Sequence, residues 1–460
     1  MSKSSEKPNR SASRRGFLQS TAWGTLGSAL ALHSRRLRAA HAAGNEKTIK
    51  VALVGCGGRG TGAAAQALST AGPVQLWAMA DAFENRLEIS RNNLIRGQVK
   101  KYDREQSGSL AERIDVPPER RFVGLNAYRQ AIDSDIDVVI LAGPPGFRPR
   151  HFQYAVQAGK HVFMEKPVAT DAPGIRQVLV AAEQAKRQNL KVGVGLQRHH
   201  QPSYLQAMRR IHDGALGDIL ALRCYWNTGQ PAKKPMPRKH RTELEYQVRN
   251  WYFFAWLSGD HICEQHVHNL DVCNWIMQDH PLQAEGMGGR QVRTGKEYGN
   301  IFDHHAVEFT YAGGTKLFSQ CRQIQGCAKQ VAEFAQGTKA IADLATNACR
   351  IRQGDTRVWS SERPRPAKRV NPYQAEHDAL FEAIRRDKPY NEAENGALST
   401  MTAILGRLAT YSGKVVTWDE AIASDIKLTT DDEDWSAAPP VCANNDGYYP
   451  TAIPGVSRVV

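Results

Sequence analysis

A glycine-rich loop directly after the first apolar run constrains the fold more than any other feature of this chain. Residues 48–55, TIKVALVG, predict a buried strand, and Gly55, Gly57 and Gly60 then form the pattern G-x-G-x-x-G at the start of a predicted helix. Glycines allow the backbone N–H groups at a helix N-terminus to approach a phosphate closely. The order of strand, loop and helix therefore predicts the first βαβ unit of a parallel sheet, with a dinucleotide site.

An acidic residue ends the second predicted strand, VQLWAMAD, residues 74–81. Asp81 lies twenty-one residues after Gly60, where a carboxylate can accept hydrogen bonds from both ribose hydroxyls and repels a 2′-phosphate. NAD is therefore favoured over NADP. The alternative is a structural glycine turn with a solvated acid. It does not explain why the strand, the glycine loop and the acid occur together at the spacing of a dinucleotide site. The residues expected to contact the dinucleotide here are Gly55, Gly57, Gly58, Arg59, Gly60 and Asp81; for Arg59, contact with the pyrophosphate and plain exposure both remain open.

The alternation of strands and helices continues to about residue 197 and then changes. The first part predicts an α/β fold with a Rossmann doubly wound parallel sheet. The later part contains long strands and Gly-Gly hairpins, which predict a C-terminal α/β domain with a large, mainly antiparallel open sheet and two C-terminal helices. An open sheet face favours a homo-oligomer. The expected divisions are a leader (1–42), the NAD-binding domain (45–197), a substrate-binding domain (198–425) and an extended tail (426–460).

The leader resembles a twin-arginine export signal. Arg14 and Arg15 precede Phe17 and Leu18 and a short, mildly apolar stretch, and residues 40–42 have the small-x-small form that a signal peptidase accepts. The alternative is an ordinary basic, amphipathic N-terminus. The signal predicts export to the periplasm by the twin-arginine machinery.

The charge of the chain gives no support for a nucleic-acid or membrane partner. Residues 1–42 contain eight Lys/Arg and one Glu, so they carry half of the net charge of +14. No Lys/Arg run interleaved with aromatic residues occurs elsewhere, as nucleic-acid binding would require. No segment has eighteen uninterrupted apolar residues, so stable membrane insertion is not expected. The eight cysteines include no C-x-x-C pair, and we expect most to be buried apolar residues.

Lys166 stands at the end of a predicted strand, in the sequence VFMEKPVAT, residues 162–170. Ligands of doubly wound folds bind outside the carboxyl ends of the strands. Lys166 is therefore expected to face the crevice that holds the nicotinamide, with Pro167 restricting the turn. A solvated loop lysine is the alternative.

Residues 256–277, WLSGDHICEQHVHNLDVCNWIM, concentrate ionisable side chains. On a helix starting near Asp260, Glu264, His268 and Asp271 fall at i, i+4 and i+7, on one face, with His261 close to it. Beside a nicotinamide, an imidazole suits removal of a hydroxyl proton, and Lys166 suits stabilisation of the oxyanion. We therefore expect His268 and Glu264 to be catalytic, and Asp271 to face the substrate. His200, after the last Rossmann strand, is a further candidate for the substrate pocket.

Two other interpretations of this segment remain. Ligand-type side chains could bind a metal ion, but His266 points away from the Glu264/His268 face of a regular helix, so no metal is expected. Alternatively, the polar groups could be satisfied by hydrogen bonds at a domain interface. The ligand-type side chains in question are Asp260, His261, Glu264, His266, His268 and Asp271.

These segments together resemble the glucose-fructose oxidoreductase / inositol dehydrogenase / MocA family over nearly the whole chain after the leader. The resemblance rests on the glycine loop, Glu165-Lys166-Pro167, the turn at residues 214–217, and the acid-x3-His-x2-Asp pattern. The sequence AILGRLATYSGKVVTWDEA resembles the exported branch. The resemblance implies a catalytic lysine at Lys166, an acid/histidine pair at Glu264 and His268, and a cofactor beside Glu165 and Lys166. Glu264 stands where an Asp is usual, and Asp260 where a Gly is usual.

The expected function is an exported, NAD-dependent oxidoreductase that acts on a hydroxyl of a sugar, polyol or glycoside. Because the periplasm holds no free nicotinamide pool, we expect a tightly held NAD. One alternative is a redox-neutral, NAD-assisted glycosidase or lyase, although the Tyr-Pro-Thr-His motif of the related N-acetylgalactosaminidases is not found. Another alternative is a non-catalytic sugar-binding protein with a structural dinucleotide.

Overall fold

A computed structural model describes residues 47–99, 110–231, 233–239, 241–362 and 370–460. The chain divides into two compact units, residues 1–48 and 49–460, and the architecture described here is that of the second unit. The expected export signal, residues 1–42, lies outside the described residues. None of the helices in the described part of the chain is both long and apolar enough to cross a bilayer.

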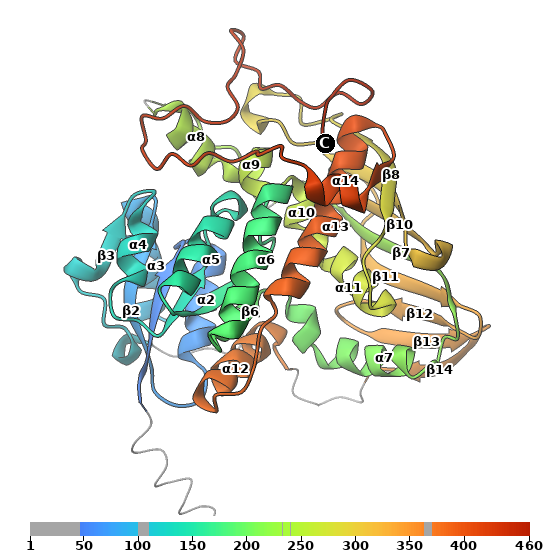
Figure 1. The fold of residues 1–460 in the computed structure, drawn as a ribbon, viewed down its shortest axis with the longest axis horizontal. Helices are drawn as coiled ribbons and strands as arrows, with labels where there is room; N and C mark the ends of the chain where they lie inside the picture. The colour runs from blue at the N-terminus through green and yellow to red at the C-terminus, as the bar shows by residue number, and fades with distance from the viewer. Residues whose placement is uncertain (1–46, 100–109, 232, 240, 363–369) are drawn as a thin grey trace, which may run out of the picture. The chain divides into compact units, whose positions relative to one another are not determined.

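Six parallel strands form the first sheet, in the order β3-β2-β1-β4-β5-β6 (Figure 1). The order reverses between β1 and β4, which is the position where ligands bind in doubly wound sheets. The predicted Rossmann sheet is therefore confirmed. Only β3, three residues at the sheet edge, had not been predicted, because so short a strand carries no periodic pattern. The strands are β1 (Ile49–Val54), β2 (Val74–Asp81), β3 (Arg121–Val123), β4 (Val138–Leu141), β5 (His161–Met164) and β6 (Val192–Val194).

Helices cover both faces of this sheet. Along β1, Ala52 and Val54 pack into one apolar cluster with α4, α5 and α6, whereas Val51 and Leu53 pack into another with α2, α3 and α12. This two-sided burial explains why the strands are nearly continuous apolar runs. The helices are α2 (Gly58–Leu68), α3 (Glu84–Ile95), α4 (Ala127–Ile132), α5 (Arg148–Gln157), α6 (Ala172–Arg187) and α12 (Pro372–Arg385).

Helix α12 departs from the expected division of the chain. The sequence predicts that both C-terminal helices belong to the second domain. In the structure, Leu380 and Phe381 of α12 join the apolar cluster that lies on the first sheet, and Gln374 donates a hydrogen bond to the backbone oxygen of Gln66 in α2. The apolar face of this helix is buried against a sheet that lies nearly two hundred residues earlier in the chain, which helical periodicity does not reveal.

Nine strands form the second sheet, in the order β14-β13-β12-β11-β7-β10-β9-β8-β15. Only the β7–β10 pair is parallel, so the predicted mainly antiparallel sheet is confirmed. Gly313 and Gly314, with φ of 75° and 87°, form the turn between β9 and β10. The strands are β7 (Ile219–Thr228), β8 (Gln283–Gly289), β9 (His304–Thr310), β10 (Lys316–Gln323), β11 (Gln330–Gly337), β12 (Ile341–Leu344), β13 (Cys349–Gln353), β14 (Thr356–Ser360) and β15 (Val416–Thr417).

Helices pack against one face of the second sheet (Figure 1). The opposite face is open, and Met287 and Phe318 on it are 79% and 45% exposed. Self-association through this face stays a prediction. The longest helix, α13, ends at Gly413, whose φ of 67° is typical of a helix C-cap. The remaining helices are α7 (Pro202–His212), α8 (Glu243–Arg249), α9 (Ala255–Ser258), α10 (His261–Glu264), α11 (Val267–Met277), α13 (Ala393–Ser412) and α14 (Trp418–Ala423).

Candidate active site

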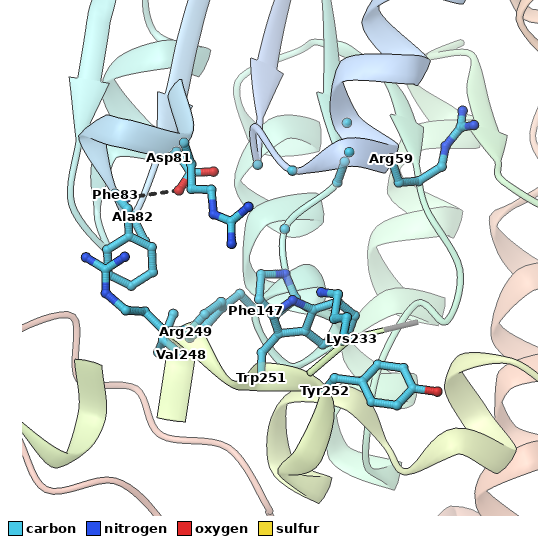
Figure 2. A pocket seen from close by; sticks show the side chains of 18 of the residues that line it. Arg59, Asp81, Ala82, Phe83, Phe147, Lys233, Val248, Arg249, Trp251 and Tyr252 are labelled. Carbon is cyan, nitrogen blue, oxygen red and sulfur yellow. Dashed lines mark hydrogen bonds between the residues drawn. The ribbon is translucent and has the colours of Figure 1, made fainter. Parts of the chain in front are cut away.

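A cavity of about 730 Å³ opens at the carboxyl ends of β1, β2 and β4 (Figure 2). One wall consists of the glycine loop, Asp81 and Gly143, at the ends of these strands. The facing wall comes from the second sheet and the segment between β7 and β8. It contains the end of β7 and the end of α8. The other residues on this wall include Gln230, Pro231, Lys233, Lys234, Met236, Trp251, Tyr252, Glu264 and Gln265. The position and size are those of a cofactor or substrate pocket.

The glycine loop has the geometry of a phosphate cradle. Gly55 has a φ of +95°, and a Cβ on it would lie 2.3 Å from the backbone nitrogen of Gly143. A Cβ on Gly60 would lie 1.9 Å from the oxygen of Gly55. A Cβ on Gly57 would meet nothing within 4 Å, so this glycine leaves backbone open to the pocket at the N-terminus of α2. A pyrophosphate therefore fits here, held by backbone N–H groups and the helix dipole.

Asp81 lies at the pocket rim, at the end of β2. Its Oδ2 accepts the N–H of Cys56 at 2.6 Å, and its Oδ1 accepts the N–H of Phe83 at 2.9 Å. Burial raises the pKa of Asp81, and these two N–H groups oppose that rise. Each oxygen retains a second lone pair, so the carboxylate can also accept ribose hydroxyls.

Arg59 lines the pocket, and its guanidinium is held by protein partners. Its guanidinium forms an ion pair with Glu165 at 2.6 Å and donates to Gln66 at 2.7 Å. The loop therefore presents its backbone to a phosphate, and contact between Arg59 and the pyrophosphate stays a prediction. Glu165, predicted to contact the cofactor, is instead 6% exposed and engaged with Arg59.

Lys166 follows β5, as predicted, and contacts the segment that the sequence placed beside it. Its ammonium donates to the backbone oxygen of Glu264 and lies 3.7 Å from the Glu264 carboxylate. The peptide bond between Lys166 and Pro167 is cis. The Lys166 side chain is 11% exposed. Lys166 is not among the residues that line the pocket, but its contact partner Glu264 is, so the two segments meet at the edge of the pocket.

The predicted single helix from Asp260 is wrong, because the segment forms two helices, α10 and α11. The break falls at Gln265 and His266, where the N–H of His266 donates to the oxygen of His261 rather than Ile262. The imidazole of His266 reaches into the sheet, where its Nε2 lies 2.7 Å from Ser319 Oγ and 3.5 Å from Cys224 Sγ. This anchoring favours a break that separates Glu264 from the helix carrying His268.

His268, in the first turn of α11, is not among the residues that line the pocket, but it contacts one of them. Its ring stacks on that of Trp226, a pocket-lining residue, with centroids 6.0 Å apart. Burial lowers the pKa of His268 well below its usual value, and the nearby positive charges of Lys166 and Arg198 lower it further. The imidazole is therefore neutral and able to accept a proton at physiological pH.

The two expected substrate contacts lie elsewhere. Asp271 is 1% exposed, accepts a hydrogen bond from Ser399 at 2.9 Å, and lies 2.8 Å from His199 Nε2. His200 Nε2 lies 3.0 Å from Glu392 Oε1. Neither residue lines the pocket. On a broken helix, Asp271 no longer shares the face of Glu264, and it satisfies buried polar groups between helices instead.

Asp260 is a buried anchor within the second domain. Its Oδ2 accepts from the N–H of Phe302 at 2.8 Å and from the hydroxyl of Tyr411 at 2.7 Å, while Oδ1 accepts the N–H of His261 at 2.5 Å. Burial alone would raise the pKa of Asp260, but His305 and His261 hold it well below its usual value. Hydrogen bonds thus occupy both carboxylate oxygens.

The ligand-type residues expected as a possible metal group do not converge in the described part of the chain. There, the ligand atoms close enough to hold an ion belong to Asp260, His261 and His305, all within 4.8 Å of one another. Glu264, His266, His268 and Asp271 are not members of this group. Both oxygens of the Asp260 carboxylate also accept hydrogen bonds from protein donors.

Several pocket residues were not anticipated from the sequence. Trp226 lies near the end of β7, and Trp251 and Tyr252 follow α8. The hydroxyl of Tyr252 accepts a hydrogen bond from Gln323 at 2.6 Å. The cluster of aromatics in NWYFFAW, residues 250–256, was the available signal. Lys233 lies over the Trp251 ring at 3.7 Å (Figure 2). These residues provide apolar faces and polar groups that a polyhydroxylated ligand can use.

Comparisons with known proteins agree with this architecture. The family model described as "Oxidoreductase family, NAD-binding Rossmann fold" matches residues 49–195. The model described as "GFO/IDH/MocA C-terminal domain" matches residues 204–343. The two matches cover the first sheet and most of the second.

Among curated relatives, an inositol 2-dehydrogenase of Klebsiella pneumoniae (strain 342) is 27% identical over 196 residues, 41% of this chain and 50% of that protein. An inositol 2-dehydrogenase of Pseudomonas savastanoi pv. phaseolicola is 25% identical over 216 residues, 46% of this chain and 55% of that protein. The chain thus spans about half the length of the curated relatives it matches.

Solved structures share the fold at low identity. An aldose-aldose oxidoreductase from Caulobacter crescentus superposes with a TM-score of 0.61 at 17% identity, over 81% of this chain and 100% of that chain. A scyllo-inositol dehydrogenase from Lactobacillus casei, with bound NAD(H) and scyllo-inositol, gives a TM-score of 0.58 at 19% identity, over 81% and 100% of the two chains.

Proposed function

Since the chain belongs to the GFO/IDH/MocA oxidoreductase family, we propose that it oxidises a secondary hydroxyl of a sugar or polyol with NAD. One observation carries the proposal. Lys166, at the carboxyl end of a Rossmann strand, is ion-paired with Glu264 beside a pocket that also contains the phosphate-binding loop and Asp81. The proposal is supported by relatives named as inositol dehydrogenases.

Each side chain has a distinct role in this reaction. NAD supplies the acceptor for the hydride that leaves the substrate carbon. The ammonium of Lys166 donates a hydrogen bond to the substrate oxygen and stabilises negative charge that develops on it. His268 accepts the hydroxyl proton, because burial and the charge of Lys166 keep its pKa low and its ring neutral. Glu264 orients Lys166 through the 3.7 Å ion pair.

The aromatic wall supports a polyhydroxylated substrate. Trp226 lies next to His268, and Tyr252 with Gln323 offers hydrogen-bonding groups on the same side of the pocket. Aromatic faces pack against the C–H faces of sugar rings, and the polar groups select hydroxyl positions. The substrate class inferred is therefore a cyclic sugar or polyol.

The proposed activity predicts reduction of the cofactor by such substrates. Incubating the purified protein with NAD and a panel of inositols, aldoses and glycosides should raise the absorbance of the reduced nicotinamide with at least one of them. The matched control is the Lys166→Ala protein with the same panel. A sugar that binds, as shown by calorimetry, without any absorbance change in the wild-type protein would favour the sugar-binding alternative.

Export with a retained cofactor is the second part of the proposal. Arg14 and Arg15 are typical of a route that carries folded proteins, and a folded chain can leave with its dinucleotide bound. Since no nicotinamide pool replaces the cofactor outside, turnover would couple two half-reactions: one sugar hydroxyl would give up the hydride, and the carbonyl group of a second sugar would take it up. Protein purified from the periplasm and denatured should release about one nicotinamide dinucleotide per chain. Its absence in protein that binds added NAD would contradict retention but not the oxidoreductase activity.

A further inference from the structure

The C-terminal tail, residues 426–460, follows a defined course although it contains no helix or strand. Figure 1 shows it leaving α14, passing α9 and α8, and returning toward the C-terminus. At its end, the N–H of Gly455 donates to the oxygen of Ser412 in α13. A segment without secondary structure keeps such a course only where side-chain and backbone contacts hold it.

The first part of the tail is anchored on the Rossmann domain. The N–H of Leu428 donates to Asp171 Oδ2 at 2.7 Å. Glu433 accepts from the hydroxyl of Tyr128 at 3.0 Å and from Arg150 at 3.1 Å. These contacts place the next residues of the tail beside the loop that follows β2.

Trp435 then contacts the dinucleotide pocket through a lining residue. Its ring stacks on Phe83 with centroids 5.3 Å apart and an angle of 26° between planes. The guanidinium of Arg249, from α8, lies 3.7 Å from the centroid of Phe83. Both Phe83 and Arg249 line the pocket (Figure 2), and the N–H of Phe83 donates to Asp81. The ring that Trp435 touches thus belongs to the same turn as the ribose-binding acid.

The tail continues by binding α8 from the second domain. The side chain of Gln247 donates to the oxygen of Val441 at 2.7 Å, and Tyr449 donates to Glu243 at 2.5 Å. Tyr449 also packs edge-on against Phe254, with centroids 4.8 Å apart. Because α8 ends in pocket-lining residues, the tail joins the two walls of the pocket next to Asp81.

We propose that the tail is a structural part of the dinucleotide site, with Trp435 as a positioning residue that holds Phe83 and Arg249 over the adenosine half of the cofactor. This inference rests on the proposed function, because it presupposes that NAD binds with its adenosine ribose at Asp81. Trp435 limits the movement of the Phe83 ring and keeps Arg249 stacked on it. Opening of this end, through which the adenosine leaves, therefore becomes slower.

The test is the dissociation rate of the dinucleotide from three variants of the full chain. Trp435→Ala and Trp435→Leu should release NADH about tenfold faster in a stopped-flow chase, whereas Trp435→Phe, which retains a stacking ring, should stay within about twofold of wild type. The leucine variant keeps apolar bulk and guards against a loss of folding. Tyr448→Ala, at a 45% exposed tail aromatic, is the matched control and should release NADH at the wild-type rate.

Binding of two fragments of the dinucleotide distinguishes a positioning role of Trp435 from general destabilisation of the protein. The affinity of ADP-ribose should fall about tenfold in Trp435→Leu, while that of nicotinamide mononucleotide should not change, since only the adenosine half lies at Phe83. The kcat at saturating NAD should be retained while the KM for NAD rises. Equal losses for both fragments, or release at the wild-type rate from Trp435→Leu, would overturn the inference. If the wild-type protein binds neither NAD nor ADP-ribose, the proposed function itself fails.

Discussion

Replacing Lys166 by alanine is expected to lower kcat by about a thousandfold and to leave the affinity for NAD within about threefold of wild type. The ammonium lies 3.7 Å from the Glu264 carboxylate, and its charge lowers the pKa of His268, so we expect it to stabilise charge on the substrate oxygen. The dinucleotide contacts in the glycine loop and at Asp81 do not involve this side chain. Steady-state rates with the best substrate of the panel, combined with NAD titration, measure both quantities.

The control for this substitution is Lys186→Ala, on α6. Lys186 is also paired with acids, Glu183 and Glu394, both at 2.7 Å, but on the exposed surface. Its loss should leave kcat unchanged. A Lys166→Ala protein that retains more than a tenth of the wild-type kcat would remove this lysine from the reaction. A parallel loss of NAD affinity would instead make it a cofactor-binding group.

Replacing His268 by asparagine is expected to lower kcat/KM by about a hundredfold or more. The decrease of kcat/KM at acidic pH should also disappear in this variant. In the wild-type protein the imidazole must be neutral to accept the hydroxyl proton, so the rate falls as pH drops through its pKa. Burial, with the charges of Lys166 and Arg198, places that pKa well below the usual value. The wild-type kcat/KM should therefore stay constant as the pH is lowered through about 6.5, the ordinary pKa of histidine. It should decrease only at a lower pH.

The pH dependence of kcat/KM also tests the electrostatic coupling between Lys166 and His268. Because Lys166 contributes to the low pKa of His268, its removal should shift the acid limb of the residual activity toward higher pH. His212→Asn, at an exposed imidazole on α7, is the matched control and should leave the limb in place. An acid limb that persists in His268→Asn would assign the proton transfer to another group.

Much of the fold could be predicted because it depends on local patterns. The strand–loop–helix order at residues 48–60 required glycines where a Cβ would clash, as at Gly55 and Gly60, and such backbone demands are visible in the sequence. Apolar runs at β1, β2, β4 and β5 were long enough to show, whereas β3 was not. The positions of Asp81 and Lys166 followed from the rule that ligands lie at the carboxyl ends of parallel strands.

The partners of these residues could not be predicted, since they come from distant segments. Arg59 turns to Glu165, more than a hundred residues later. Tail residue Trp435 stacks on Phe83 across the length of the chain. Helical periodicity suggested one helix for residues 260–277, but His266 reaches Ser319 in another strand and the helix breaks there.

By itself, the sequence determined the two sheets, the phosphate loop, the acid after the second strand and the lysine after the fifth, because each depends on neighbouring residues and on backbone sterics. Only the tertiary structure decided which ionisable groups share the pocket and which are buried as anchors. The physical reason is that hydrogen bonds and charge effects depend on distances of a few ångströms between side chains. The separation of two residues along the sequence carries no information about those distances.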